Sequence, residues 1–270
     1  MISYGAKENA MTVDERPATP FPAIDLLLDE LSGRIQLVLR DKLIGLYLYG
    51  SLVTGDFDHT HSDLDLLAVL RSELNGEEFA RLDAMHGAFV AAHPQWEERV
   101  EIAYLEQDAL RTFRTQSGPI AIISPGEPFH FKEAGKDWLI NWWIVRRQGA
   151  ALYGPRAADV IGPISDDEFQ QAVREQVAEW RTYVYEAQRR KSQAYAILTL
   201  CRALYAFHNG EQVSKRQAAE WAADYFPQWG PLIRSAWQWR VAPDEEGVDH
   251  AATRPATVQF AQEVADYMGV

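Results

Sequence analysis

The sequence predicts an α/β (α+β) fold in two parts: an N-terminal domain with a small mixed sheet flanked by helices, and a C-terminal all-α helical bundle. Short apolar runs typical of buried strands occur at residues 43–49, 63–70 and 99–105, and amphipathic stretches separate them. This alternation indicates an α/β domain. From Asp137 onward the apolar spacing becomes helical. A length of 270 residues is near twice that of a typical domain, which favours two domains.

The expected domain boundaries follow changes in composition. Residues 1–20 are polar and irregular, and we expect a flexible N-terminal tail there. The sheet domain is expected over residues 21–154, because a Gly-Pro pair at its end interrupts the chain between two helical stretches. Residues 155–270 are expected to form the helical domain.

The helices of the first domain have a clear periodic signal. Apolar residues recur at helical spacing over residues 24–40 and 77–92, which predicts two helices packed on the sheet. The stretch between Arg111 and Lys136 is punctuated by glycine and proline, and we expect it to be irregular.

The second half carries helix start and stop signals. Acidic residues gather at 166–168, where the start of a helix favours negative charge, and an amphipathic run continues to about Arg190. A second apolar helical pattern covers residues 194–207 and ends at Asn209-Gly210, whose glycine suits a left-handed cap. A helical bundle is the simplest arrangement of these segments.

The turn at Gly50 has the features of a phosphate-binding site. The first apolar run ends there, and the missing Cβ lets backbone N–H groups approach an anion closely. Ser51 is expected to cap a short helix and to offer its hydroxyl to the same anion. Gly50 and Ser51 are therefore predicted to bind the phosphates of a nucleotide.

Asp63 and Asp65 form a candidate metal site. Side chains two residues apart on a strand share a face, so both carboxylates point the same way. They repel each other unless a cation lies between them, and their oxygens suit Mg²⁺ shared with a nucleotide. An Asp-x-Asp pair is also common at solvated strand ends and helix caps, but its place soon after the Gly-Ser turn favours the metal site.

Composition excludes several classes of protein. The 26 basic and 39 acidic residues give a formal net charge of −13, which argues against a nucleic-acid partner and favours a cationic acceptor. The single cysteine, Cys201, excludes an intrachain disulfide and a Cys-based zinc site. No signal-peptide pattern occurs, and no apolar run approaches the ~18 residues of a membrane span. We expect a cytoplasmic monomer without a membrane partner.

The motifs together resemble a known family. Gly50-Ser51, Gly55-Asp56 and the Ser-Asp-Leu-Asp-Leu run at 62–66 resemble the signature of the nucleotidyltransferase superfamily. The sequence of residues 61–67, His-Ser-Asp-Leu-Asp-Leu-Leu, resembles that of the streptomycin/spectinomycin-type aminoglycoside adenylyltransferase branch of this superfamily. The resemblance implies an N-terminal nucleotidyltransferase domain with ATP and Mg²⁺ as its cofactors. It further implies transfer of AMP from ATP to a hydroxyl of a small molecule of the aminoglycoside-antibiotic type.

Glu101 is the candidate third carboxylate. It is a lone acid within the apolar run 99–105, where an unpaired carboxylate costs free energy. The family resemblance implies that Glu101 is the general base that deprotonates the acceptor hydroxyl, and that it joins Asp63 and Asp65 in holding the metal. A surface glutamate on an edge strand is the alternative interpretation.

Two cations of the second half match the family's C-terminal domain. The Leu-Thr-Leu-Cys-Arg run ending at Arg202 and the Ser-Lys-Arg run around Lys215 carry this resemblance. It implies that Arg202 and Lys215 contact the nucleotide phosphates, a role suited to an arginine fork and a lysine point charge. The alternative is two solvated cations at helix ends.

The acceptor side departs from the family pattern. The streptomycin and spectinomycin enzymes carry tryptophan and acidic residues just before the Leu-Thr-Leu segment, whereas residues 188–193 here read Gln-Arg-Arg-Lys-Ser-Gln. Transfer to a different small molecule, transfer to a protein partner and non-catalytic nucleotide binding stay open as alternatives. His59, His61 and His93 lack the spacing of a hydrolase metal site, and His61 is expected to orient the loop beside Asp63.

Overall fold

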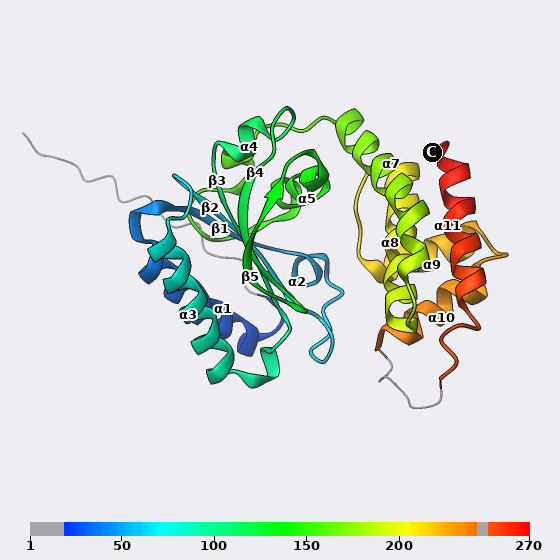
Figure 1. The fold of residues 1–270 in the computed structure, drawn as a ribbon, viewed down its shortest axis with the longest axis horizontal. Helices are drawn as coiled ribbons and strands as arrows, with labels where there is room; N and C mark the ends of the chain where they lie inside the picture. Colours follow the sequence, from blue (N-terminus) through cyan, green and yellow to red (C-terminus); the bar gives the residue numbers. More distant parts are fainter. Residues whose placement is uncertain (1–18, 242–247) are drawn as a thin grey trace, which may run out of the picture.

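The computed structural model describes residues 19–241 and 248–270. Figure 1 shows two parts of the molecule: on the left a sheet with the helices that cover it, and on the right a group of helices. Most of the expected tail lies outside the described residues. At the start of the described residues, the Thr19 backbone N–H donates to Oδ1 of Asp25 over 3.0 Å.

The described residues form a six-stranded mixed sheet with strand order β5-β4-β3-β2-β1-β6. Strands β2 and β3 pair in parallel, and the other neighbouring strands pair antiparallel. The fold class predicted from the sequence is thereby confirmed. The strands are β1 (Leu43–Tyr49), β2 (Leu64–Leu70), β3 (Val100–Glu106), β4 (Gly118–Ser124), β5 (Glu127–Ala134) and β6 (Ala150–Tyr153).

Three of these strands correct the sequence analysis. The stretch between Arg111 and Lys136 was expected to be irregular, and this is wrong, because β4 and β5 form an antiparallel hairpin there. Pro119 and Pro128 lie at the second position of β4 and β5, and Pro125 lies in the turn between them. β5 is an edge strand, where a missing N–H is tolerated. Strand β6 was also missed. Its four residues pair with β1 at the opposite edge, a contact with no local sequence signal.

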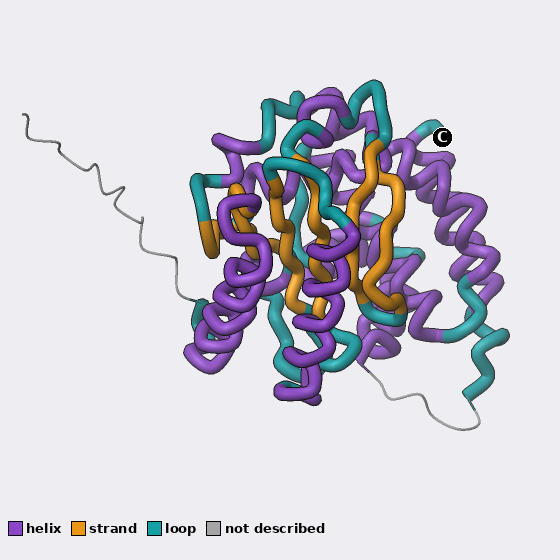
Figure 2. The backbone as a smooth tube through the Cα atoms, turned by 60° about the vertical axis from the view of Figure 1, so that its left-hand side comes forward, coloured by secondary structure: helices purple, strands orange, loops and turns teal. Residues whose placement is uncertain are grey.

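Helices cover both faces of the sheet. α1 (Pro22–Leu39) and α3 (Gly76–Ala92) lie on one face, as Figure 2 shows, and α5 (Leu139–Gln148) packs on the other. Alternate side chains of β1 serve the two faces: Leu46 and Leu48 join the α1 and α3 layer, while Tyr47 and Tyr49 face α5. The predicted helices at 24–40 and 77–92 are confirmed to within two residues.

The second half is helical around α8, which packs against four other long helices. Gly210 ends α8 at φ 73°, the left-handed cap that the sequence predicts. A capping box between Ser165 and Glu168 starts α7 at the predicted acidic turn. The long helices are α7 (Asp166–Tyr183), α8 (Arg190–Asn209), α9 (Lys215–Tyr225), α10 (Gly230–Val241) and α11 (Arg254–Met268).

Short helical segments connect these elements. None of the helices in the described ranges has the length and apolar character needed to cross a lipid bilayer. The α-helical turns are α2 (Ser51–Thr54), α4 (Ala109–Thr112) and α6 (Ala157–Val160). The 3₁₀ segments are η1 (Arg40–Lys42), η2 (Pro94–Trp96), η3 (Lys136–Trp138) and η4 (Val184–Glu186).

One apolar core runs from the α5 face of the sheet into the helical half. Trp143 of α5 stacks on Phe169 of α7 with ring centres 3.9 Å apart, and both are buried. Buried residues of β1, α5, α7 and α8 belong to the same cluster. The two halves are therefore packed together, and the domain boundary at Gly154 stays a prediction.

His86 on α3 is a buried titratable group in the other core. Its side chain is 2% exposed, and its Nε2 shares a hydrogen bond of 2.9 Å with the Tyr104 hydroxyl. Burial lowers the pKa of His86 to about 4. The folded protein thus binds this proton only at a pH well below the value of 6.5 for the unfolded chain.

We expect the free energy of unfolding to decrease as the pH is lowered from about 6.5 to 4. Over this range the unfolded chain binds a proton that folded His86 does not. Urea unfolding at pH 7 and pH 5 measures this effect. The loss should be about 2 kcal/mol greater for the native protein than for His86→Gln, which cannot titrate. Equal losses in the two proteins contradict the assignment.

Candidate active site

Gly50 forms the turn that begins the site. Its φ of 72° lies in the left-handed region, and a Cβ there would collide with Oδ2 of Asp65. The glycine thus brings the end of β1 directly against that carboxylate. The expectation that Ser51 caps the following helix is wrong, since Gly50 is the N-cap of α2 and Ser51 is its first residue. Its hydroxyl is not used in capping.

The pairing of three strands brings the carboxylates together. Asp65 on β2 lies directly opposite Glu101 on β3 in the parallel register and opposite Tyr49 on β1 in the antiparallel one. The Tyr49 hydroxyl donates a hydrogen bond of 3.4 Å to Oε1 of Glu101. β3 is an inner strand, so Glu101 is not the edge-strand surface glutamate of the alternative interpretation. Asp63 lies just before β2, which begins at Leu64.

The three carboxylates share an unfavourable environment. Burial raises the pKa of Asp65 to about 8, and the charges of Glu101 and Asp63 add to the rise. The pKa values of Asp63 and Glu101 are also raised, chiefly by burial. Such a group of partly buried like charges calls for a cation.

The donor chemistry fits a hard divalent cation. Asp63, Asp65 and Glu101 offer only oxygen ligands, and bound positive charge would relieve their mutual repulsion. Across residues 19–241 and 248–270, no three carboxylate, imidazole or thiol side chains converge closely enough to hold a metal ion as they lie. The carboxylates are neighbours, and a metal site that uses all three requires their side chains to turn.

Cations from the helical half face these acids. Burial lowers the pKa of Lys215 to about 8, with the charges of Arg202 and Arg240 adding to the effect. Within the described structure, Nε of Arg202 is buried and has no hydrogen-bond partner. Asp65 interacts electrostatically with both Arg202 and Lys215. The two predicted cations are thus brought to the carboxylates, and both carry unmet capacity for an anion.

Sequence reasoning missed Arg240. It lies at the end of α10, its charge acts on Asp63, Arg202 and Lys215, and its guanidinium lies 5.3 Å from the Trp237 ring centre. Arg240 belongs to no recognisable motif, because it lies in the last turn of a helix with an ordinary amphipathic pattern. Its role depends on the packing of α10 against α8 and α9.

A direct ion pair joins the loop after α2 to the start of α9. Nε of Arg216 lies 3.0 Å from Oδ1 of Asp56, and the Arg216 backbone N–H donates to Oδ2 over 3.2 Å. The guanidinium of Arg216 also lies 5.4 Å from the Trp237 ring centre. The cations of the helical half are thereby fixed relative to the sheet.

Lys132 of β5 is a second residue that sequence reasoning missed. Its charge lowers the pKa of Glu101, against the larger effect of burial, and its ammonium lies 5.1 Å from the Trp138 ring centre. The hairpin that carries Lys132 was itself not predicted, so no sequence signal placed it near Glu101.

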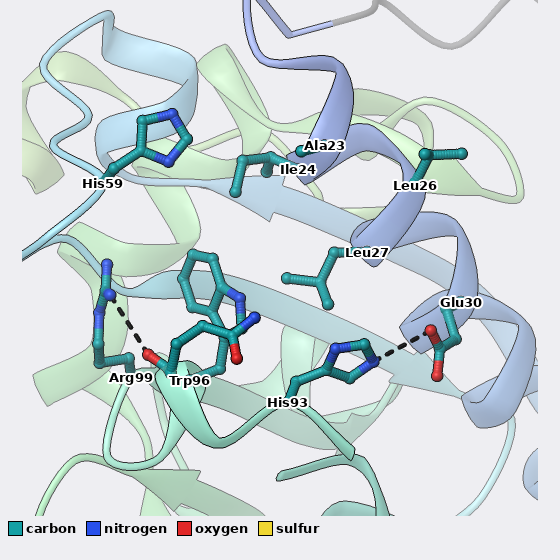
Figure 3. A pocket seen from close by; sticks show the side chains of 10 residues that line it. Ala23, Ile24, Leu26, Leu27, Glu30, His59, His93, Trp96 and Arg99 are labelled. Atoms are coloured by element: carbon teal, nitrogen blue, oxygen red, sulfur yellow. Dashed lines mark hydrogen bonds and ion pairs between the residues drawn. The ribbon is translucent and has the colours of Figure 1, made fainter.

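The three histidines do not gather at the carboxylates. His59 and His93 line a hollow of about 350 Å³ beside α1, where His93 pairs with Glu30 over 3.1 Å (Figure 3). His61 is exposed and its Nδ1 lies 3.4 Å from Asp58, so it contacts the loop before Asp63 rather than Asp63 itself. A histidine metal site is not formed by these residues.

Gly50→Ala and Gly55→Ala form a matched pair that tests the packing of the turn. Both glycines have φ above 70°, so alanine costs each about 1–2 kcal/mol of backbone strain. Only a Cβ at Gly50 meets Asp65, since nothing lies within 4 Å of one at Gly55. Urea unfolding should therefore show a further loss of about 1–3 kcal/mol for Gly50→Ala. Equal losses contradict close packing of the turn on Asp65.

Two family profiles match most of the chain. Residues 33–136 match the nucleotidyltransferase domain, and residues 159–267 match the C-terminal domain of aminoglycoside adenylyltransferase. An aminoglycoside (3'') (9) adenylyltransferase from Escherichia coli is 25% identical over 229 residues, which is 81% of this chain and 86% of that protein. A protein of the same name from Rhizobium radiobacter is 30% identical over 110 residues, 40% of this chain and 39% of its own.

A solved structure has the same fold. The spectinomycin adenyltransferase of Enterococcus faecialis, crystallised with ATP and spectinomycin, matches with a TM-score of 0.72 at 17% identity, covering 90% of this chain and 99% of its own. Its agreement concerns the fold, whereas the profiles and relatives concern the sequence. By these matches the chain belongs to the aminoglycoside adenylyltransferase family of the nucleotidyltransferase superfamily, and it is an adenylyltransferase.

Proposed function

We propose that this enzyme transfers AMP from ATP to a hydroxyl of an aminoglycoside-type small molecule in a Mg²⁺-dependent reaction. The observation that carries the proposal is the meeting of two sets of opposite charge, with Asp63, Asp65 and Glu101 on the sheet side and Lys215 and Arg202 on the helical side. A triphosphate with its metal is a ligand that satisfies both sets.

The cations hold the triphosphate. Arg202 presents a buried Nε without a partner in the described structure, and Lys215 and Arg240 add two further positive charges beside it. Gly50 and Ser51 contribute backbone N–H groups and a hydroxyl at the turn. A phosphate group between them would remove the repulsion among the three cations, which is a gain that an acceptor alone does not provide.

The carboxylates are the metal ligands in this proposal. Asp63, Asp65 and Glu101 would hold Mg²⁺, which when bound neutralises charge on the triphosphate and on the leaving pyrophosphate. Asp65 supports this assignment most strongly, because burial and the charges of Glu101 and Asp63 raise its pKa despite Lys215 and Arg202, and a bound cation would favour its charged form.

Glu101 acts as the general base. The Tyr49 hydroxyl orients its carboxylate, and burial raises its pKa toward the range in which a base is effective at neutral pH. Glu101 accepts the proton of the acceptor hydroxyl as the hydroxyl oxygen attacks the α-phosphorus of ATP. The bond from that phosphorus to the bridging oxygen breaks, pyrophosphate leaves, and AMP becomes joined to the acceptor.

The start of α8 indicates which acceptors suit the site. Arg190 is held there by a hydrogen bond of 3.2 Å from its backbone N–H to His250, and its guanidinium lies 5.5 Å from the Trp239 ring centre. Five residues further, the Tyr195 ring centre lies 5.4 Å from the Lys215 ammonium. The run 189–191 is Arg-Arg-Lys and carries no acid that could pair with an acceptor's guanidinium groups, so we propose a spectinomycin-like rather than a streptomycin-like acceptor.

Asp65→Asn should abolish adenylyl transfer, because it removes the carboxylate at the centre of the proposed metal site. Glu101→Gln should spare ATP binding and slow the chemical step about 10²–10⁴-fold. Mg²⁺-dependent release of pyrophosphate measures both effects, and Asp83→Asn on the exposed surface of α3 is the control. Substantial activity in Asp65→Asn contradicts the metal assignment.

A panel of acceptors tests the substrate class. We expect pyrophosphate release with spectinomycin at a higher kcat/KM than with streptomycin, and a product heavier than the acceptor by one adenylyl group in mass spectrometry. Cells that express the protein should show reduced susceptibility to spectinomycin. Turnover with neither compound contradicts the aminoglycoside acceptor, and labelling of a cellular protein by radioactive ATP would favour a protein acceptor instead.

A further inference from the structure

Asp63 is the least supported of the three carboxylates along the backbone. Asp65 and Glu101 lie within paired strands, but Asp63 precedes β2 at the end of the loop that follows α2. Within this loop the Ser62 hydroxyl accepts a hydrogen bond of 2.9 Å from the Asp58 N–H. That contact is local to the loop, and a further contact is needed to join the loop to the sheet.

Arg99 makes that connection from both sides of Asp63. Its Nε and Nη2 both donate to the Ser62 carbonyl oxygen, over 3.1 and 2.5 Å. Its own carbonyl accepts the Leu64 N–H over 2.9 Å. Ser62 and Leu64 are the immediate neighbours of Asp63, so one residue fixes the backbone before and after the carboxylate.

Arg99 is itself held in place. Its guanidinium lies 4.5 Å from the ring centre of the buried Trp96, and Nη1 donates weakly to the Gln95 carbonyl over 3.4 Å. Figure 3 shows Arg99 beside Trp96 at the edge of the hollow next to α1. The Phe57 ring stacks on Trp96 with centres 6.5 Å apart, which ties the same loop to the same support. The fork therefore acts from a packed base.

Arg99 directly precedes β3 and is two residues from Glu101. A shift of β3 against the loop would change the distance between Glu101 and Asp63, and the fork on the Ser62 carbonyl opposes that shift. The charge of Arg99 also offsets part of the cost of burying the Asp63 carboxylate. Both effects favour one geometry of the carboxylate set.

We propose that Arg99 is a positioning residue that holds Asp63 in register with Asp65 and Glu101, and thereby sets the affinity of the enzyme for metal-bound ATP. The inference rests on the proposed function. It assigns to Arg99 no contact with ATP or with the acceptor. Residues that orient metal ligands in this way typically change metal affinity by about 10–100-fold when replaced.

The test is equilibrium binding of ATP by isothermal titration calorimetry, without acceptor, in excess Mg²⁺ and again in EDTA. Arg99→Met keeps the apolar stem over Trp96 and removes every side-chain donor, and Arg99→Lys keeps the charge and a single donor nitrogen. Arg34→Met is the matched control. Like Arg99, Arg34 lies over a buried aromatic ring, with its guanidinium 5.7 Å from the Phe89 ring centre, and it pairs only with Glu30 among the described contacts. Thermal unfolding of all four proteins identifies any loss of fold.

We expect Arg99→Met to raise the Kd for ATP in Mg²⁺ about 10–100-fold while the Kd in EDTA stays within about twofold. Arg99→Lys should recover part of the loss, and Arg34→Met should match the native protein in both buffers. An equal rise in both buffers, or no rise in either, overturns the positioning role and leaves the proposed function standing. If the native enzyme binds ATP equally in both buffers, the metal assignment fails and the inference fails with it.

Discussion

The parallel pairing of β2 with β3 creates a group of repelling, partly buried carboxylates, and positive charge from the rest of the molecule must compensate it. The pairing places Asp65 and Glu101 side by side at the sheet, with Asp63 close in sequence, and burial of these like charges raises the pKa of all three. For Asp65 the compensating charge comes from Arg202 and Lys215, on helices more than 130 residues further along the chain. The fold is therefore useful only when its helical half lies against its sheet.

That requirement explains the continuous core between the halves. The stacking of Trp143 on Phe169 fixes α7 against the sheet side, and the Arg216–Asp56 ion pair fixes the start of α9 beside the turn after β1. Arg216 is mostly exposed, so its ion pair contributes orientation more than stability. The cations and the acids then face each other before any ligand arrives, which reduces the entropy lost on binding.

The site also combines rigid and adjustable parts. Asp65 and Glu101 are carried by inner strands, whereas Asp63 belongs to a loop that Arg99 attaches to the sheet through backbone contacts. A metal site that uses all three carboxylates requires their side chains to turn, since no three donors converge in the described residues. A scaffold of strands with one tethered loop permits that movement and keeps the carboxylates within reach of each other.

The sequence by itself determined the features that depend on local order. The run from Leu43 to Leu70 specifies two strands, the turn at Gly50 and the Asp-x-Asp pair, because alternation, the missing Cβ and i, i+2 spacing are short-range properties. The sequence did not predict β4, β5 and β6. Prolines in β4 and β5 and the short length of β6 hide the strand pattern, and these strands are stabilised by pairing with their neighbours. Only the tertiary structure brought Arg240, Lys132 and Arg99 to the carboxylates, because those meetings depend on how separate elements pack and leave no pattern along the chain.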